Sequence, residues 1–114
     1  MAYFIAQPHD IAQLRKRFSL EMPVETPDGA GGMITSYALV ANVWGAIVAR
    51  NGYELWVAER IEQNVSHQIT IRYREGITAA HRFILGARRF NMIAVADLDG
   101  RKRRLVCQVE EITP

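Results

Sequence analysis

Residues 67–74 read His67-Gln68-Ile69-Thr70-Ile71-Arg72-Tyr73-Arg74, and this stretch decides the fold. Apolar and polar side chains alternate along it, which is the pattern of a half-buried β-strand. Neighbouring side chains of a strand point to opposite faces. One face therefore carries His67, Ile69, Ile71 and Tyr73, and the other carries Gln68, Thr70, Arg72 and Arg74.

Strand patterns recur on both sides of this segment. Pro23 predicts that the first strand lies at a sheet edge or ends there, because proline cannot donate to a ladder. The uncharged run from Tyr37 to Ala49 predicts a strand buried on much of both faces and bent at Gly45. Two later strands are linked as a hairpin across residues 86–88. The six predicted strands are residues 17–22, 37–49, 67–74, 82–85, 89–95 and 103–110.

Two segments between the strands depart from this pattern. In residues 52–62, Leu55, Ala58 and Ile61 recur every three positions with acids between them, which predicts a short amphipathic helix. Residues 25–35 are rich in glycine and turn formers and predict a mobile loop. The sequence therefore predicts an all-β-dominated fold: a small antiparallel β-barrel or sandwich of about six strands, with one short α-helix and long loops.

The composition limits the class of protein. A chain of 114 residues, 49% hydrophobic and 23% charged, makes one domain (1–114), in which residues 1–13 are an N-terminal extension. No apolar stretch approaches the roughly 20 residues of a membrane-spanning helix, so no membrane partner is expected. The single cysteine, Cys107, excludes an internal disulfide and most cysteine-based zinc sites. We expect a domain that matures in a reducing compartment.

Residues capable of catalysis or metal binding show no recognisable spacing. His9, His67 and His81 are far apart and lack the spacing of metal ligands. Ser66 and His67 are strand neighbours that point to opposite faces, so we expect no catalytic triad. The sequence predicts no enzyme, no catalytic residue, no metal and no cofactor.

The basic residues are nearly all arginines and lie in clusters, although the net charge is only +2. Arginine binds phosphate or carboxylate with two hydrogen bonds at once. Each cluster is either a solvated strand end or a contact with a polyanion or an acidic partner. The candidate DNA or partner contacts are Arg15, Lys16, Arg17, Arg72, Arg74, Arg88, Arg89, Arg101, Lys102, Arg103 and Arg104.

One constellation resembles a known family. Ser66-His67-Gln68-Ile69-Thr70-Ile71-Arg72-Tyr73-Arg74-Glu75-Gly76-Ile77-Thr78 is similar to the signature segment of the phage head–tail joining proteins, also called head-completion or stopper proteins. Residues 14–20 resemble the family's opening strand, 43–46 its Trp-containing second strand, and 89–97 with 103–105 its closing hairpin. The resemblance covers about residues 14 to 111. It departs at residues 29–32 and at Tyr37, where the family often has an aromatic-glycine turn and a Trp.

The resemblance implies a virion structural protein of a phage or of a phage-derived gene transfer agent. Such proteins form a ring, sixfold or twelvefold, below the portal and adaptor proteins and above the tail terminator or tail tube. The ring is assembled in the host cytoplasm, retains packaged DNA and offers a platform for the tail. Double-stranded DNA passes through its channel and is contacted without sequence readout.

Two segments carry the residues that the resemblance singles out. The segment between the second strand and the signature strand, residues 50–65, would reach the channel. Its candidate gating residues are Arg50, Tyr53, Glu54, Trp56, Glu59, Arg60 and Glu62. The Gly-rich loop would reach a neighbouring ring, through Asp28, Gly29, Gly31, Gly32 and Met33.

Two other functions stay open. The chain is alternatively a tail-terminator ring protein, or a monomeric small β-barrel that binds nucleic acid. Barrels of the latter kind interleave aromatic and cationic side chains on an exposed sheet face. Only Arg72-Tyr73-Arg74 has that pattern here, and Tyr73 alternates to the apolar face.

Overall fold

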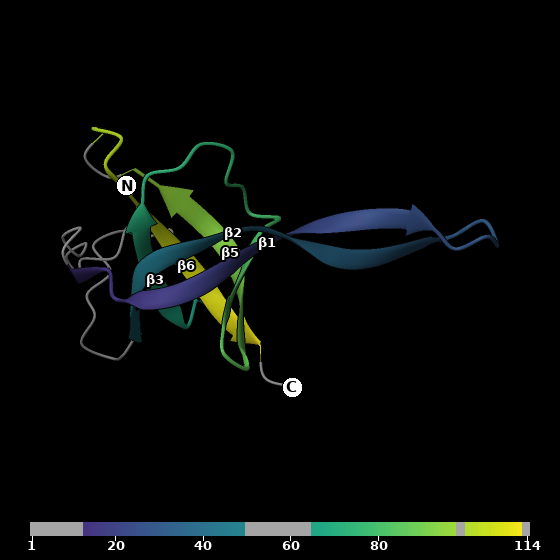
Figure 1. Cartoon of the computed structure of the whole chain (residues 1–114), viewed down its shortest axis with the longest axis horizontal. Coiled ribbons are helices and arrows are strands. Elements are labelled where there is room, and N and C mark those ends of the chain that lie inside the picture. The colour runs from purple at the N-terminus through teal and green to yellow at the C-terminus, as the bar shows by residue number, and fades with distance from the viewer. Residues whose placement is uncertain (1–12, 50–64, 98–99, 113–114) are drawn as a thin grey trace.

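The computed structural model describes residues 13–49, 65–97 and 100–112. Their strands are β1 (Lys16–Pro27), β2 (Met33–Ala49), β3 (His67–Arg72), β4 (Arg82–Leu85), β5 (Arg88–Ala96) and β6 (Arg104–Ile112). Every neighbouring pair is antiparallel, and the order β1-β2-β3-β6-β5-β4 closes into a barrel (Figure 1). The all-β fold is confirmed, and of the two predicted architectures it is the barrel. The helix predicted at residues 52–62 lies outside the described residues.

Alternate side chains of the strands fill the barrel interior. Phe18, Phe83 and Phe90 are fully buried, and the rings of Phe18 and Phe83 meet edge to face with centroids 5.6 Å apart. Burying a side chain of this size stabilises the fold by about 1.5–3 kcal/mol. The other buried members of this core are Leu20, Ile69, Ile71, Met92, Leu105, Cys107 and Val109.

Strand β3 is buried on both faces, which the alternation alone did not predict. Ile69 and Ile71 point into the core, and Tyr73 beyond the strand packs against it. Gln68 and Thr70, on the opposite face, are as deeply buried, at 1% and 0% exposure. The polar face of the signature strand becomes exposed only from Arg72 onward.

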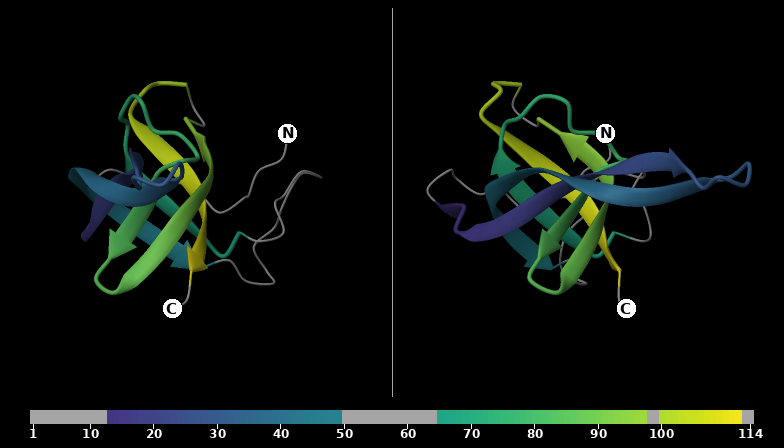
Figure 2. Two further views of the ribbon diagram at one scale, coloured as in Figure 1. Left: turned by 90° about the vertical axis from the view of Figure 1, so that its right-hand side faces the viewer. Right: turned by 45° about the vertical axis from the view of Figure 1, so that its right-hand side comes forward.

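Strands β1 and β2 extend beyond the barrel as a two-stranded arm, which we define as residues 22–40. On the barrel, β1 also pairs with β4, but only through Ser19, Leu20 and Glu21. A β-bulge between Leu20 and Glu21, opposite Val40, marks the base of the arm. Bulges bend and twist a strand pair, and Figure 2 shows the arm leaving the barrel as a twisted ribbon.

The arm gives the molecule an elongated shape. The principal dimensions are 48, 29 and 27 Å, and the radius of gyration is 15.0 Å. A compact chain of this length has a radius of gyration of about 13 Å. The described residues contain no helix that could cross a bilayer.

Three sequence-based predictions need correction here. Strand β1 does not end at Pro23, which pairs with Tyr37 inside the arm; the alternative prediction, an edge position, is confirmed, because no strand among the described residues pairs with the other side of Pro23. Residues 25–27 and 33–35 belong to β1 and β2, so the turn is confined to residues 28–32. The prediction that Tyr37–Ala49 is buried on both faces is wrong, because residues 37–40 lie on the arm and only Gly45 and Ala46 are fully buried.

Candidate functional site

The tip of the arm is an ordered turn built on one carboxylate. The backbone N–H groups of Ala30 and Gly32 donate to Asp28 Oδ1 at 2.8 and 2.9 Å, and the N–H of Asp28 donates to the carbonyl of Gly32 at 3.1 Å. Gly29 and Gly31 adopt φ values of 82° and 86°, which favour glycine. The hydrogen bonds from Ala30 and Gly32 lower the pKa of Asp28. The predicted inter-ring residues thus form a defined hairpin tip.

Contacts among three side chains connect the base of the arm to the barrel. Arg82 Nε on β4 donates to Glu21 Oε1 at 2.8 Å. The same guanidinium lies over the ring of Tyr37, 3.5 Å from its centroid. Because β4 contacts both strands of the arm through this one side chain, the direction of the arm is tied to the barrel.

The large apolar side chains that are exposed in the described part of the chain all lie on β1 and β2. Leu39, Met33 and Ile34 are the most exposed, at 58%, 58% and 54%. Exposed apolar side chains gathered on one part of a protein mark an interaction site. The full set is Met22, Val24, Met33, Ile34, Tyr37, Leu39, Val40 and Trp44.

Cations from three sequence clusters form a row across four strands of the barrel. Arg17 pairs with Trp44, Gly45 with Ile71, and Arg72 with Arg104. This register places Arg17, Trp44, Arg72 and Arg104 side by side on the outer face, since Gly45 and Ile71 face the core. The Arg17 guanidinium lies over the Trp44 ring at 4.9 Å. We call these four residues the cationic row.

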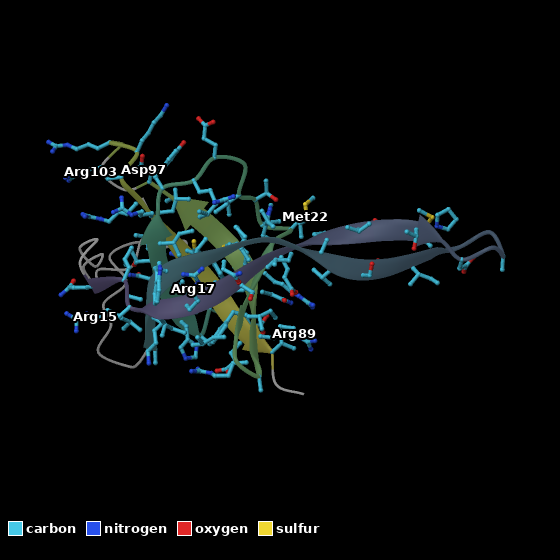
Figure 3. All side chains as sticks on the ribbon, viewed as in Figure 1. Arg15, Arg17, Met22, Arg89, Asp97 and Arg103 are labelled. Carbon is cyan, nitrogen blue, oxygen red and sulfur yellow. The ribbon has the colours of Figure 1, made fainter. Side chains whose placement is uncertain are left out.

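A basic turn adjoins the row. Asp97 Oδ2 accepts the backbone N–H of Lys102 at 2.8 Å, and the carbonyl of Asp97 accepts the N–H of Gly100 at 3.2 Å. Lys102 is thereby held at φ 58°, a conformation that L residues rarely adopt. Figure 3 shows Arg15, Arg17 and Arg103 toward the end of the molecule opposite the arm tip. The fold thus gathers the clusters at residues 15–17, 72–74 and 101–104.

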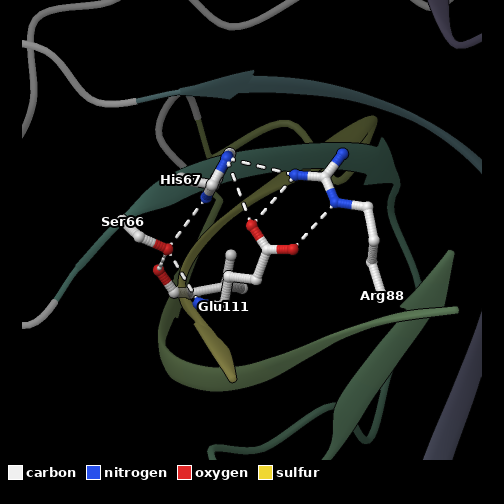
Figure 4. A network of polar contacts seen from close by, with 5 residues as sticks. Ser66, His67, Arg88 and Glu111 are labelled. Atoms are coloured by element: carbon white, nitrogen blue, oxygen red, sulfur yellow. Dashed lines mark hydrogen bonds and ion pairs between the residues drawn. The ribbon is translucent and has the colours of Figure 1, made fainter. Parts of the chain in front are cut away.

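The fourth cluster, Arg88-Arg89, lies elsewhere, and Arg88 is engaged by an acid (Figure 4). Arg88 donates through Nε and Nη2 to the two carboxylate oxygens of Glu111, at 2.9 and 3.0 Å. This bond raises the pKa of Arg88 and lowers that of Glu111. This bidentate pair links the start of β5 to the end of β6, two strands that also pair through their backbones.

Ser66 and His67 do touch, contrary to the prediction from their spacing. Ser66 Oγ lies 2.8 Å from His67 Nδ1, because Ser66 precedes β3 and is free of strand geometry. Ser66 Oγ also accepts the N–H of Glu111 at 2.7 Å. The Glu111 carboxylate is 3.9 Å from His67 Nε2, too long for a hydrogen bond, and is committed to Arg88. Burial lowers the pKa of His67, with Glu111 opposing the shift and Arg88 adding to it.

The other His and Cys side chains of the described residues, those of His81 and Cys107, are buried in the fold. His81 is buried, and its Nδ1 accepts the backbone N–H of Thr78 at 3.1 Å. Burial raises the pKa of the Cys107 thiol far above its ordinary value, which keeps the thiol protonated. Within the described ranges, no three His, Cys, Asp or Glu side chains come together as a metal site.

The structure places some predicted site residues and not others. The candidate channel residues at positions 50–62 lie outside the described residues. Of the arm's exposed apolar side chains, only Met33 was among the predicted site residues. A signal was available in the sequence, because residues 33–44 carry no charge, no proline and no glycine. Residues 33–35 of this run were assigned to the mobile loop, and residues 37–44 to a buried strand.

Comparisons with known proteins agree with this architecture. A family model described as phage head completion protein matches residues 9–112. A chain in the structure titled virion of native gene transfer agent (GTA) particle is 28% identical, with a TM-score of 0.64, covering 89% of this chain and 97% of that one. Protein SF1141 from Shigella flexneri 2a, 22% identical, shares the fold with a TM-score of 0.67, covering 90% of this chain and 96% of that one. No curated protein matches.

The barrel with its arm therefore defines a structural protein of phage-like particles, a class of virion component. More particularly, this chain belongs to the phage head completion protein family. The family is one of structural head proteins.

Proposed function

We propose that the protein forms a ring between the portal–adaptor complex and the tail, where it retains packaged DNA and offers the tail a platform. The observation that carries this proposal is the family match over residues 9–112, supported by the similarity to a chain of a gene transfer agent virion. The arm supports it physically, because an exposed apolar ribbon is costly in an isolated monomer and useful in an assembly.

In this proposal the copies are related by sixfold or twelvefold symmetry, and heterologous contacts close the ring. The segment at residues 50–65, between β2 and β3, lines the channel, and the arm tip at Asp28–Met33 reaches an adjacent ring. Assembly takes place in the host cytoplasm. No cofactor, metal or catalytic step is part of the proposed role.

The cationic row has a place in the same proposal. Arg17, Arg72 and Arg104 present guanidinium groups on one outer face, next to Trp44. Such a row binds DNA phosphate without reading sequence. Repetition around a ring multiplies the modest net charge of each copy.

Electron microscopy of particles assembled without this protein tests the proposal. We expect DNA-filled or leaking heads accompanied by unattached tails, because packaging precedes the step that the protein performs. Heads that never package DNA would contradict it.

The cationic row also favours the second candidate, a monomeric nucleic-acid-binding barrel, because a cation stacked on an exposed aromatic is a feature of such surfaces. The purified chain and double-stranded DNA at increasing salt separate the two. Strong binding by the monomer that weakens steeply with salt supports the second candidate. Weak binding by the monomer, together with stable attachment to filled heads, supports the connector.

A further inference from the structure

The two edges of the arm are chemically different. Beyond its pairing with β4, which ends at Glu21, the free edge of β1 carries Pro23 and Pro27 together with Glu25. Prolines and charges on an edge strand prevent another strand from pairing with it. The β1 edge is therefore closed to strand addition.

The free edge of β2 has none of this protection. β3 pairs with β2 only from Gly45 to Ala49, so residues 33–44 have no second strand among the described residues. We call this stretch the β2 edge. It consists of 12 residues without a charge, proline or glycine. A long uncharged edge of this kind is a template for one more strand.

The β2 edge runs into a groove at the base of the arm. It is lined by Asn42, Val43 and Trp44 of β2, by Arg72, Tyr73 and Arg74 at the end of β3, and by Leu14. The volume of this groove is about 400 Å³. Arg72 and Arg74 are exposed, and neither forms an ion pair within the described part of the chain. The groove therefore joins apolar walls to two available guanidinium groups.

We infer that the β2 edge and this groove together accept an extended strand of a different protein of the particle. The chemistry of the surface defines that strand: mostly apolar side chains along residues 33–44, and an acidic group at the end that lies near Arg72 and Arg74. Backbone hydrogen bonds to β2 supply the affinity, and the groove sets the register. The inference rests on the proposed connector function and identifies the chemistry of one partner.

A second copy of this chain fits the surface less well. Outside β1 and β2, the described residues expose no large hydrophobic side chain that the arm of a neighbour would cover. Within the described residues, a second copy offers only its own β2 edge. Pairing of two identical edges closes a twofold dimer and leaves no edge for further assembly, unlike the ring proposed above.

Binding of the purified full chain to DNA-filled heads that lack it tests the inference. Leu39→Lys places a charge on the β2 edge, at a position 58% exposed, and Arg74→Glu replaces one of the two groove cations with an anion, which cancels the charge of Arg72. The control is Val24→Lys, which adds the same charge to the same arm on β1. Thermal unfolding verifies that all three variants fold.

We expect Leu39→Lys and Arg74→Glu each to weaken co-sedimentation with heads at least tenfold, and Val24→Lys to bind within twofold of the wild type. In hydrogen exchange on the bound chain, amides of alternate residues between positions 33 and 44 become protected, while those of residues 22–27 do not change.

Three results would overturn the inference in distinguishable ways. If the wild-type chain does not bind filled heads, the connector function fails and the inference with it. If the wild type binds and Leu39→Lys binds equally well, the strand site alone is wrong. If the free chain forms a dimer that Leu39→Lys abolishes and Val24→Lys does not, the partner is a second copy.

Discussion

The apolar side chains on one face of strand β1 are buried in the first part of the strand and exposed in the second. Phe18 and Leu20 are fully buried in the barrel, whereas Met22 and Val24, the next two residues on that face, are 43% and 37% exposed. The alternation of side chains does not change between them. What changes is the neighbouring strand: β4 pairs with β1 as far as Glu21 and no further.

This contrast shows two different roles of apolar residues in the chain. In the barrel, apolar side chains stabilise the fold of the single chain, because a third strand and the opposite wall cover them. On the arm, β1 and β2 pair only with each other among the described residues, and a two-stranded ribbon is marginally stable by itself in water. The arm residues are therefore expected to contribute little to folding and much to assembly.

The largest expected effect on the free energy of unfolding comes from comparing Phe90→Ala in the barrel with Ile34→Ala on the arm. Phe90 is fully buried, and His67 packs on its ring with centroids 5.4 Å apart, whereas Ile34 on the arm is 54% exposed. We expect Phe90→Ala to lower the free energy of unfolding by about 3–5 kcal/mol. Ile34→Ala should change it by less than about 0.5 kcal/mol.

Urea denaturation followed by tryptophan fluorescence and far-UV circular dichroism measures both values. A domain of this size has roughly 5–15 kcal/mol of stability, so Phe90→Ala can leave the chain partly unfolded. Phe90→Leu, which keeps more of the volume, then provides a measurable intermediate. Equal losses for Phe90→Leu and Ile34→Ala would contradict the separation of the two regions.

Gly45 tests the junction at which the pairing of β2 with β3 begins, on the barrel side of the arm. A Cβ atom there would lie 2.9 Å from the Phe18 ring and 3.0 Å from the backbone carbonyl of Thr70. Neither neighbour can yield easily, since one is in the core and the other is backbone. We expect Gly45→Ala to cost about 1–3 kcal/mol by overpacking, measured by thermal unfolding.

The matched control for this change is Gly76→Ala, at a turn where a Cβ atom would meet nothing within 4 Å. Gly76 has a φ of 85°, so its replacement costs backbone strain without a clash. A loss confined to Gly76→Ala, with Gly45→Ala neutral, would show that β2 tolerates a side chain at the junction and that the close packing on Phe18 is not required.

The sequence predicted the strands well and their surroundings poorly. The alternation at residues 67–74 and the hairpin around residues 86–88 follow from local periodicity and turn chemistry, and both predicted hairpin strands are present. Whether Gln68 is covered, or whether Tyr37 is not, depends on elements that are distant in the sequence. No local pattern contains that information, so residues 37–40 of the arm were interpreted as a buried strand and residues 25–35 as a mobile loop.

The candidate site, too, was predictable from the sequence only in part. Clusters of arginine are visible in the sequence, but the alignment of Arg17, Arg72 and Arg104 requires the register of four strands. Ser66 and His67 were predicted to point to opposite faces, on strand geometry that applies only from residue 67 onward. Register and strand boundaries, rather than residue types, were the missing information.

The ion pair between Arg88 and Glu111 gives a smaller effect on stability, and this effect depends on pH. Glu111→Gln removes the bidentate pair with Arg88, whose side chain is 45% exposed. A pair of this exposure contributes roughly 0.2–1 kcal/mol. The pKa of Glu111 is lowered in the folded state, so its stabilisation is present above the unfolded pKa of about 4.3 and is lost as pH falls through the folded value.

His67 affects the stability of the fold at a higher pH than Glu111 does. Its folded pKa is lowered by burial, so the folded state favours the neutral ring, and stability falls as pH drops below the unfolded value of about 6.5. Because Glu111 opposes this shift, Glu111→Gln should make the loss between pH 7 and 5 steeper. Urea midpoints at each pH measure it, with Glu75→Gln in an exposed turn as the control. An unchanged slope would show that Glu111 does not act on His67.

The arm tip gives the smallest effect, because it is local. Asp28→Ala removes the acceptor of the Ala30 and Gly32 N–H groups, whereas Asp28→Asn retains a neutral oxygen in the same place. We expect faster amide exchange at Ala30 and Gly32 in Asp28→Ala, an intermediate rate in Asp28→Asn, and no change at Ile69 or Ile71 in the core. The pKa of Asp28 is lowered by these N–H donors, so acidifying the wild type through that pKa should reproduce the loosening of the tip. If exchange at Ile69 rises together with exchange at the tip, the arm and the barrel unfold as one unit, and the arm contributes to the stability of the barrel after all.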